Sequence, residues 1–542
     1  MTRIFIAQNN YVIGDFELNT QKIINSIGQA KQKNCTLIVT SELALLGYPP
    51  KDLLYYSSIL KESQKTIEKI LPQTKGVTLL LGCVRENVDK GNSLFNSCAI
   101  IQDGKLVDYY DKWLLPTYDV FNERRYFSPG KDIKVIEHDG KKVALTICED
   151  LWHDQLDGLY DKNPLSEIAS HRPDFLVNLS ASPFELHKLY KRINLCKEVS
   201  NKLSCPVLFC NQVGGNDSLI FDGYSFVCDQ KSILSFAKGF EEDSIVYDSQ
   251  ETQTLPITPY LNPEQLYNAL VLGLKDYFHK QNFSKALIGL SGGIDSALVA
   301  TLAAHAIGSE NVRVISMPSR YSSTHSIEDA KKLARNLSVE LLEIPIEAVH
   351  KSYLDLLEAP FKGLEEDVTE ENIQSRIRGM ILMACSNKWG HLVISCGNKS
   401  EMAMGYATLY GDLTGGLAAI SDLTKSQVYE VAKWINFNKE IIPLSIIEKA
   451  PSAELKPDQK DSDSLPDYEV LDQIIVDYVE EHLEPTAIAQ RHKFDLELVK
   501  AIVKKIHLSE YKRRQAPIGL KVTQKAFSNG WQLPIVHAHH RD

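Results

Sequence analysis

Long apolar runs and an excess of positive charge are both missing from this chain of 542 residues. No stretch approaches the roughly 18 consecutive apolar residues of a membrane-spanning helix, and the segment MTRIFIAQNN begins as a strand rather than as a signal peptide. Asp and Glu number 70 against 59 Lys and Arg, and the formal charge of -11 disfavours nonspecific binding to nucleic acid or anionic membranes. We therefore expect a cytoplasmic protein with small-molecule partners, no nucleic acid and no membrane.

Metal-type cysteine spacings are missing as well. The ten cysteines include no CxxC pair and no Cys/His ligand spacing, so nearly all are expected to be buried thiols. The glycine-rich segment at 289–296 lacks the Gly-Lys-Ser/Thr ending of a Walker A loop. Any nucleotide site in this chain is therefore expected to be of another kind.

Length and pattern together predict two domains. Residues 3 to about 250 alternate short β-branched runs with amphipathic segments, and a polar stretch rich in Thr and Pro follows at 248–265. Beyond it, strand and helix patterns alternate at the spacing of a doubly wound parallel sheet. We predict a layered α/β domain at 1–250, a linker at 251–262 and a Rossmann-like α/β domain at 263–542.

Three residues of the first half end or follow strand-like runs. Glu42 closes CTLIVTSE, Lys112 follows LVDYYD, and Cys148 ends VALTIC. Strand ends on one edge of a sheet commonly converge on a site. A thiol nucleophile needs a base for its proton and a cation for the charge that develops on the attacked carbonyl oxygen. These three residue types therefore favour acyl transfer.

The segments around these residues resemble the nitrilase (carbon-nitrogen hydrolase) superfamily. The similar segments are SELALLGYPPKD, YDKWLLPTYDVFNERRYF and ICEDLWH, in the order of the family. The resemblance implies an α-β-β-α sandwich in which Glu42 is the general base, Lys112 holds the tetrahedral intermediate and Cys148 forms a thioester. It also implies an orienting role for a second acidic residue, Glu123. Longer members of the family, which are fused to synthetases, bind glutamine through a Tyr, a Ser and a basic residue. The resemblance implies that Tyr118, Ser182 and Lys188 bind glutamine in this chain.

The segment KALIGLSGGIDSA at 285–297 predicts a buried strand, a small-residue turn and a helix start. In this arrangement, backbone amides and the positive end of the helix surround a phosphate. Gly292 and Gly293 allow close approach of the main chain, and Ser291 and Ser296 add hydroxyl donors. The carboxylate of Asp295 would repel a polyphosphate unless a divalent cation lay between them, so the loop predicts Mg²⁺ together with ATP.

This loop resembles the SGGxDS loop of the ATP pyrophosphatases, and the segments ENIQSRIRGM, CGNKSEMAMGYATLYGD, EKAPSAEL and EYKRRQAPIGLKVT resemble the NAD synthetases. The resemblance implies that Asp295 and Glu401 hold Mg²⁺. It also implies that deamido-NAD is bound by Asn372, Glu401 and Lys512. The residues implied to bind ATP are Gly289, Leu290, Ser291, Gly292, Gly293, Ile294, Asp295, Ser296, Cys396 and Lys449. Cys396 stands where the family usually has Thr.

Together, the two resemblances imply that the chain forms NAD from deamido-NAD with ATP and glutamine, through an adenylated intermediate, and releases AMP, pyrophosphate and glutamate. Members of the synthetase family pair into dimers, so we expect a homo-oligomer. Two alternatives remain open at this point. One is a glutamine amidotransferase that acts on another carboxylate, and the other is a carbon-nitrogen hydrolase with a nucleotide-sensing domain.

Overall fold

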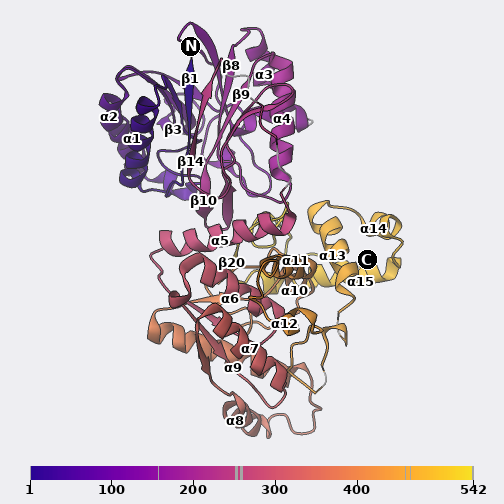
Figure 1. The fold of residues 1–542 in the computed structure, drawn as a ribbon. Coiled ribbons are helices and arrows are strands. Elements are labelled where there is room, and N and C mark those ends of the chain that lie inside the picture. The colour runs from indigo at the N-terminus through magenta and orange to yellow at the C-terminus, as the bar shows by residue number, and fades with distance from the viewer. Residues whose placement is uncertain are drawn as a thin grey trace. The chain divides into compact units, whose positions relative to one another are not determined.

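The structure, a computed structural model, describes residues 2–156, 158–250, 254–256, 260–457, 459–463 and 465–539. The chain divides into two compact units, Met1–Tyr260 and Leu261–Asp542 (Figure 1). Of the predicted linker at 251–262, residues 251–253 and 257–259 lie outside the described part of the chain. Each unit carries its own candidate site.

Unit 1 contains two six-stranded sheets that face each other between two helical layers (Figure 1). One sheet has the order β14-β1-β2-β3-β4-β5, and its strands are Asp243–Asp248, Arg3–Gln8, Leu37–Val39, Thr78–Glu86, Leu94–Gln102 and Lys105–Asp111. The other has the order β13-β12-β9-β8-β7-β6, and its strands are Ile233–Phe236, Phe226–Cys228, Val207–Asn211, Phe175–Ser180, Lys141–Ile147 and Val135–His138. The helices are α1 (Phe16–Gln32) and α2 (Ser57–Ile70) on one face, and α3 (Pro164–Ala169) and α4 (Lys188–Leu203) on the other. The predicted α-β-β-α sandwich is confirmed.

Local sequence explains these layers. Val39 and Leu80 of one sheet pack in a common apolar core with Leu145 and Val177 of the other, so the inner strands are apolar nearly throughout. Helix α2 buries Ser63, Thr66, Ile67 and Ile70, which is the spacing of one helical face. A hairpin turn at Asp103-Gly104 joins β4 to β5, with Gln102 paired to Lys105. Both turn residues have positive φ, as a two-residue hairpin turn requires.

Unit 2 is built on one parallel sheet with the order β17-β16-β15-β18-β19-β20. In that order the strands are Glu340–Glu343, Val312–Ser316, Ala286–Gly289, Leu392–Ser395, Leu417–Ala418 and Ile518–Gly519. Successive strands run outward from β15 to β17, and the chain then returns to β18 on the other side of β15. This reversal beside β15 is the point at which doubly wound sheets bind ligands, beyond the carboxyl ends of the strands.

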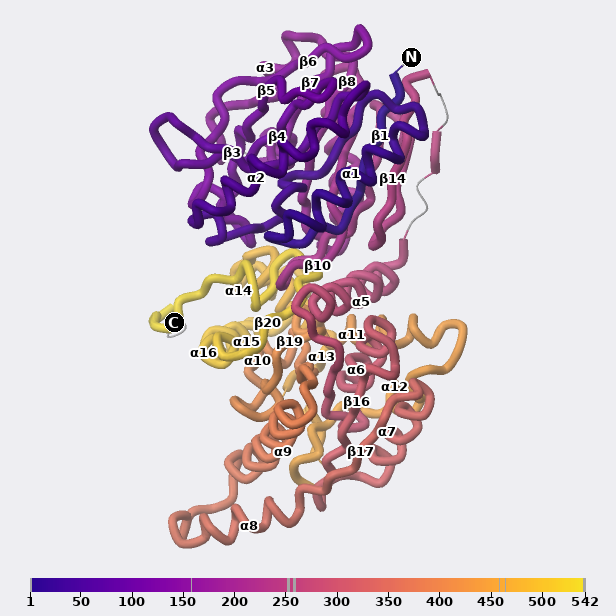
Figure 2. Tube along the Cα trace, turned by 90° about the vertical axis from the view of Figure 1, so that its left-hand side faces the viewer, coloured from indigo at the N-terminus to yellow at the C-terminus, as the bar shows by residue number. Residues whose placement is uncertain are grey.

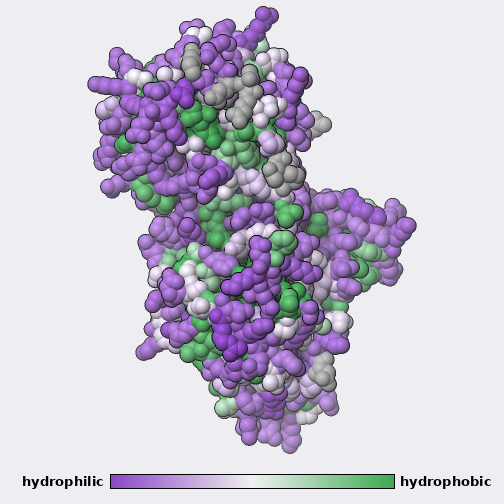
Figure 3. Space-filling model, in the orientation of Figure 1, coloured by the Kyte–Doolittle hydropathy of each residue, from purple (hydrophilic) through white to green (hydrophobic). Residues whose placement is uncertain are grey.

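Helices cover this sheet and extend unit 2 at its C-terminal end, where α13, α14 and α15 gather beside α10 (Figure 2). In chain order, α5 to α16 are Asn262–Lys280, Ile294–Ile307, Thr324–Leu337, Glu347–Leu357, Val368–Trp389, Lys399–Met404, Lys425–Ile435, Leu444–Glu448, Tyr468–Ile475, Pro485–His492, Leu496–Leu508 and Glu510–Arg513. The visible face of each unit is mostly hydrophilic (Figure 3). Within the described residues, none of the helices has the length and apolar character needed to span a membrane.

Candidate active sites

Four predicted catalytic residues of unit 1 lie at strand ends or in the turns that follow. Glu42 comes shortly after β2, Lys112 directly after β5, and Cys148 directly after β7. Glu123 begins a short 3-10 turn in the long segment that follows Lys112. All four side chains are buried, at 6% exposure or less. The sandwich therefore encloses all four of these side chains.

Lys112 lies between two carboxylates. Its Nζ donates to Glu42 Oε1 at 2.7 Å and to Glu123 Oε1 at 2.8 Å. Burial opposes the charged amine, but the two carboxylates outweigh it and raise the pKa of Lys112 well above its usual value. Burial also raises the pKa of Glu123 to about 7. The cluster thus holds a permanent ammonium beside one carboxyl that titrates near neutrality.

Further polar groups, which the sequence did not single out, complete this cluster. Asn96 Nδ2 donates to Glu42 Oε1 at 2.7 Å, and the Ala181 backbone N–H donates to Glu42 Oε2 at 3.0 Å. The Tyr48 hydroxyl donates to Glu123 Oε1 at 2.8 Å. Asn96 is a buried amide within the apolar run of β4, and a polar residue in such a run is the signal that would have found it.

Cys148 occupies a strained turn that aims it at the cluster. Its φ of 43° is uncommon for a residue with a side chain. The turn is tied down by Asp150, which accepts from the Ile147 N–H at 2.8 Å and from the Leu114 N–H at 2.9 Å. Burial, followed by Glu42, raises the pKa of the Cys148 thiol, while Lys112 acts in the opposite direction. The thiol is therefore neutral before reaction, and its attack requires a base.

The residues predicted to bind glutamine come from two segments of unit 1. The Tyr118 hydroxyl donates to Glu149 Oε1 at 2.9 Å, and Glu149 is the buried neighbour of Cys148. Ser182 Oγ accepts from Arg192 Nε at 3.0 Å. Lys188 begins α4, and its Nζ lies 3.7 Å from Glu185. Tyr118 is thus linked to the nucleophile through Glu149. Ser182 follows Ala181, whose N–H donates to Glu42. Burial raises the pKa of Glu149, and Lys188 at the start of α4 is close enough to that carboxyl to act in the opposite direction.

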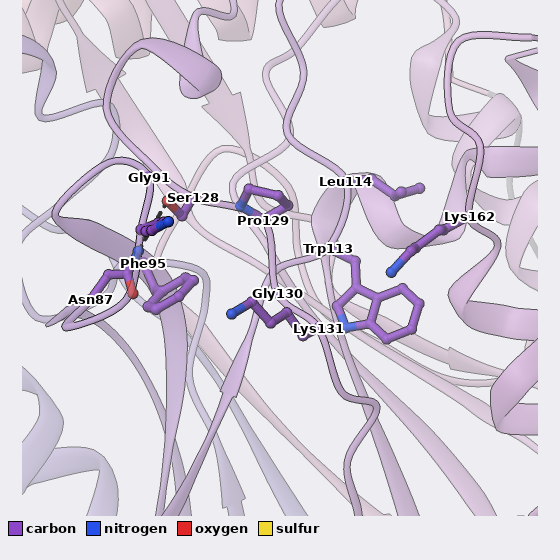
Figure 4. Close-up of a pocket in the computed structure, with 11 residues that line it drawn as sticks. Asn87, Gly91, Phe95, Trp113, Leu114, Ser128, Pro129, Gly130, Lys131 and Lys162 are labelled. Carbon is purple, nitrogen blue, oxygen red and sulfur yellow. Dashed lines mark hydrogen bonds between the residues drawn. The ribbon is translucent and has the colours of Figure 1, made fainter.

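A separate cavity of about 270 Å³ lies in unit 1 (Figure 4). Its walls include Phe95, Trp113 and Pro129, and the Lys162 ammonium points toward the Trp113 ring, 5.6 Å from its centre. None of the four clustered residues lines this cavity, although Trp113 directly follows Lys112. The cavity is therefore not part of the candidate catalytic cluster.

In unit 2, the predicted phosphate loop joins β15, which ends at Gly289, to α6, which begins at Ile294. The Ser291 N–H donates to Ser296 Oγ at 3.2 Å, so a side chain of the first helical turn fixes the loop. Gly292 has a φ of 81°, and a Cβ there would lie 2.2 Å from the Ser326 carbonyl oxygen. Only glycine fits this position. The side chains of Leu290 and Ile294, also predicted to bind ATP, are buried, so these two residues would contact ATP through their backbone groups.

A second lysine between two carboxylates lies at the edge of this loop. Lys425 Nζ donates to Asp295 Oδ2 at 2.6 Å and lies 3.6 Å from Glu401 Oε1. Asn398, the N-cap of α10, donates from Nδ2 to Asp295 Oδ1 at 2.9 Å. Burial, then the neighbouring Asp295, raises the pKa of Glu401 to about 8. Lys425 was not predicted, and a lysine just after the N-cap of a helix carries little sequence signal.

The donors at this edge fit Mg²⁺. Asp295 and Glu401 offer hard oxygen ligands, and the single ammonium of Lys425 does not fully compensate two carboxylates. The described residues contain no group of three or more His, Cys, Asp or Glu side chains arranged for a metal. Mg²⁺ is usually held by one or two carboxylates together with phosphate oxygens.

The remaining predicted residues of unit 2 are engaged with protein groups. Asn372 Oδ1 accepts from Thr408 Oγ1 at 2.7 Å. Lys512 Nζ donates to the Gly405 and Ala407 carbonyls at 2.7 and 2.8 Å. Lys449 pairs with Glu454, and Cys396 follows β18 and is half-buried.

Comparison with known proteins matches each half of the chain to a family. The carbon-nitrogen hydrolase family matches residues 3–253, and the NAD synthase family matches residues 266–516. A glutamine-dependent NAD(+) synthetase of Synechocystis is 45% identical over 100% of this chain and 99% of its own length. One of Thermotoga maritima is 42% identical over 99% and 98%. The chain belongs to the glutamine-dependent NAD(+) synthetases. It is accordingly a ligase that uses a nucleotide substrate.

Solved structures agree with this family assignment. A glutamine-dependent NAD+ synthetase from Acinetobacter baumannii, solved in complex with adenosine diphosphate, is 36% identical, covers 98% of both chains and has a TM-score of 0.79. Another glutamine-dependent NAD(+) synthetase, from Cytophaga hutchinsonii, is 20% identical with a TM-score of 0.85, and this likeness shows the shared fold.

Proposed function

We propose that this synthetase amidates deamido-NAD with ammonia taken from glutamine and activates the nicotinate carboxylate with ATP through an adenylated intermediate. The products would be NAD, AMP, pyrophosphate and glutamate. One observation carries the proposal: a single chain holds a buried thiol, lysine and carboxylate cluster and, separately, a phosphate loop whose aspartate faces a second carboxylate. The first arrangement suits amide hydrolysis, and the second suits polyphosphate chemistry.

In unit 1, Glu42 would take the proton from Cys148 as the sulfur attacks the amide carbon of glutamine. Lys112 would stabilise the oxyanion of the tetrahedral intermediate, because its ammonium is already fixed by two carboxylates and needs no reorganisation. Collapse of the intermediate expels ammonia, which takes the proton from Glu42, and leaves a glutamyl thioester. Water, deprotonated by Glu42, would then hydrolyse this thioester to glutamate.

Glutamine would be positioned by the predicted residues Tyr118, Ser182 and Lys188. We add Glu149 to this set because its buried carboxylate directly follows the nucleophile and accepts from Tyr118. A buried carboxylate suits the α-ammonium group of an amino acid, and Lys188 suits its α-carboxylate. Charges of both signs near Cys148 would therefore favour a free amino acid over a neutral amide.

In unit 2, the predicted ATP residues from Gly289 to Ser296, with Cys396 and Lys449, would bind ATP. The nicotinate carboxylate of deamido-NAD, held near Asn372, Glu401 and Lys512, would attack the α-phosphorus and release pyrophosphate. Ammonia would then displace AMP. Asp295 and Glu401 would hold Mg²⁺, which when bound neutralises phosphate charge, and Lys425 would offset the charge of the two acids.

A coupled assay tests this proposal. Purified protein is given deamido-NAD, ATP and Mg²⁺ with either glutamine or an ammonium salt, and NAD, AMP and pyrophosphate are quantified. We expect equal amounts of the three products from either nitrogen source. Formation of AMP and pyrophosphate only when a different carboxylate replaces deamido-NAD would point to another acceptor. Glutamine hydrolysis without AMP would instead favour a hydrolase with a nucleotide-sensing domain.

A further inference from the structure

A carboxylate of the chain itself occupies a set of hydrogen-bond donors beside the phosphate loop. Glu454 Oε1 accepts from Lys449 Nζ at 2.8 Å and from Ser326 Oγ at 2.7 Å. It also lies 2.9 Å from Ser323 Oγ, and Oε2 accepts from the Ser323 N–H at 3.1 Å. One ammonium, two hydroxyls and one backbone amide therefore converge on a single anionic group.

These donors lie directly against the loop that is proposed to bind ATP. The Ser326 carbonyl oxygen is only 2.2 Å from where a Cβ of Gly292 would stand, so nothing separates Ser326 from the loop backbone. Lys449 Nζ also donates to Ser326 Oγ. The side chains of Lys449 and Glu454 are 30% and 18% exposed, so an arriving ligand can reach both. The donor set is thus a continuation of the phosphate loop.

The chemistry of the set suits phosphate oxygens as well as it suits a carboxylate. Although burial opposes charge on Glu454, the hydrogen bonds from Lys449, Ser326 and Ser323 outweigh it and lower the pKa of this carboxyl. Glu454 is therefore anionic at neutral pH. A triphosphate in the loop and a charged Glu454 cannot share these donors without mutual repulsion.

We propose that Glu454 is an intramolecular competitor of the pyrophosphate portion of ATP. It holds Lys449, Ser323 and Ser326 while the loop is empty, gives them up to the β- and γ-phosphates when ATP binds, and recaptures them as pyrophosphate leaves. This inference rests on the proposed function, since it requires ATP cleavage to AMP and pyrophosphate at this loop. Glu454 would thus weaken the binding of pyrophosphate and speed its release.

Pyrophosphate binding to full-length protein tests the competition. Glu454→Gln keeps the size of the side chain and removes its charge. In the presence of Mg²⁺, calorimetry should show pyrophosphate binding on the order of 10-fold tighter to Glu454→Gln than to the wild type. Product inhibition by pyrophosphate in the ammonium-driven assay should strengthen equally, and the KM for ATP should fall. The matched control is Glu328→Gln on α7, the helix that carries Ser326. It removes an exposed carboxylate that pairs with Lys331 and should change neither value beyond twofold.

The outcomes separate two failures. If the wild type binds neither ATP nor pyrophosphate, the proposed function itself falls. If the wild type binds both, but Glu454→Gln binds pyrophosphate no tighter, Glu454 only positions Lys449 and the competition is refuted. Should Glu454→Gln fail to fold, hydrogen exchange of the wild-type peptide 449–456 decides the matter. Displacement of Glu454 predicts faster exchange when pyrophosphate is added, whereas slower exchange overturns the inference.

Discussion

Both candidate sites bury one lysine between two carboxylates, but the two lysines are held differently. In unit 1, Lys112 donates at hydrogen-bond distance to both Glu42 and Glu123. In unit 2, Lys425 donates to Asp295 but lies 3.6 Å from Glu401. The first lysine is symmetrically paired, and the second leaves one carboxylate under-compensated.

The remaining partners widen this difference. In unit 1, Asn96, Tyr48 and the Ala181 amide donate further hydrogen bonds to the two carboxylates, so several protein groups hold each of them. In unit 2, the contacts of the Glu401 carboxylate with described side chains and amides are a 3.3 Å bond from the Asn398 N–H and a long contact with Lys425. Burial and the neighbouring Asp295 raise the pKa of Glu401 to about 8. A closed cluster suits chemistry done by side chains, whereas an under-compensated acid pair suits a site completed by a cation and phosphates.

The largest expected effect is that of Cys148→Ala, which should stop the chemistry of unit 1 and leave that of unit 2 intact. Cys148→Ala should lower glutamine-driven NAD formation by at least about 1,000-fold, because no other group supplies the nucleophile. The ammonium-driven reaction should stay within twofold of the wild type in the coupled assay. Cys205→Ala, which removes a buried thiol outside the cluster, should preserve both reactions. Loss of the ammonium-driven reaction in folded Cys148→Ala protein would refute the division of labour.

A substitution in unit 2 should slow NAD formation from glutamine and from ammonium to the same extent. Asp295→Ala removes the carboxylate nearest the phosphate loop and leaves Lys425 to repel the cation that the site requires. We expect NAD formation from glutamine and from ammonium to fall together by on the order of 100-fold. Glu310→Gln, an exposed acid just beyond α6, serves as the charge control. If only the glutamine-driven rate fell, the acid pair would not belong to the ATP site.

The sequence predicted the larger parts of both sites because their signals are local. A position at the end of a strand-like run, or directly after one, indicated Glu42, Lys112 and Cys148, and the small-residue turn indicated the loop around Gly292. The fold class followed from alternating strand and helix patterns, and the structure confirms it. Resemblance to two families then suggested roles that periodicity alone does not contain.

The supporting residues escaped prediction because their partners are distant in the chain. Asn96 meets Glu42 across 54 positions, and Lys425 meets Asp295 across 130. The residues next to Asn96 or Lys425 in the sequence do not indicate such a contact. The sheet order and the helix packing create it. Glu454 likewise reads as a solvated acid until the fold brings it to Ser323. The cytoplasmic location and the homo-oligomer stay predictions.

A pH profile tests the role of Glu123 in the closed cluster, which consists of Glu42, Lys112, Glu123 and Cys148. Burial raises the pKa of Glu123 to about 7, so this carboxyl becomes protonated as the pH falls through that value and Lys112 loses one of its two counter-charges. Lys112 then pairs more tightly with Glu42, which becomes a weaker base. We expect kcat/KM for glutamine hydrolysis to decline below about pH 7. Glu123→Gln should lower the rate by about 10-fold at pH 8 and abolish this acidic limb.

Tyr48→Phe supplies the matched control for that profile. The Tyr48 hydroxyl donates to Glu123 and thereby lowers its pKa, so its removal should move the acidic limb to higher pH without eliminating it. Measurement of glutamate release between pH 5.5 and 9 follows all three proteins. An unchanged limb in Glu123→Gln would assign the titration to a different group.

The smallest expected effect concerns Cys396 of unit 2, where the resemblance to the NAD synthetases implies a Thr. Cys396 stands where a Thr is usual, and its Sγ lies 3.9 Å from the Ile394 carbonyl oxygen, at the limit of a weak thiol contact. Burial raises the pKa of this thiol, so it stays neutral and is a poor donor to phosphate or ribose oxygens. Cys396→Thr should therefore lower the KM for ATP by about 2- to 5-fold, as one added hydroxyl contact allows. Glutamine hydrolysis in unit 1 should not change. An unaltered KM would mean that the backbone alone makes this contact, and the ATP site would then depend on its side chains less than the closed cluster of unit 1 does.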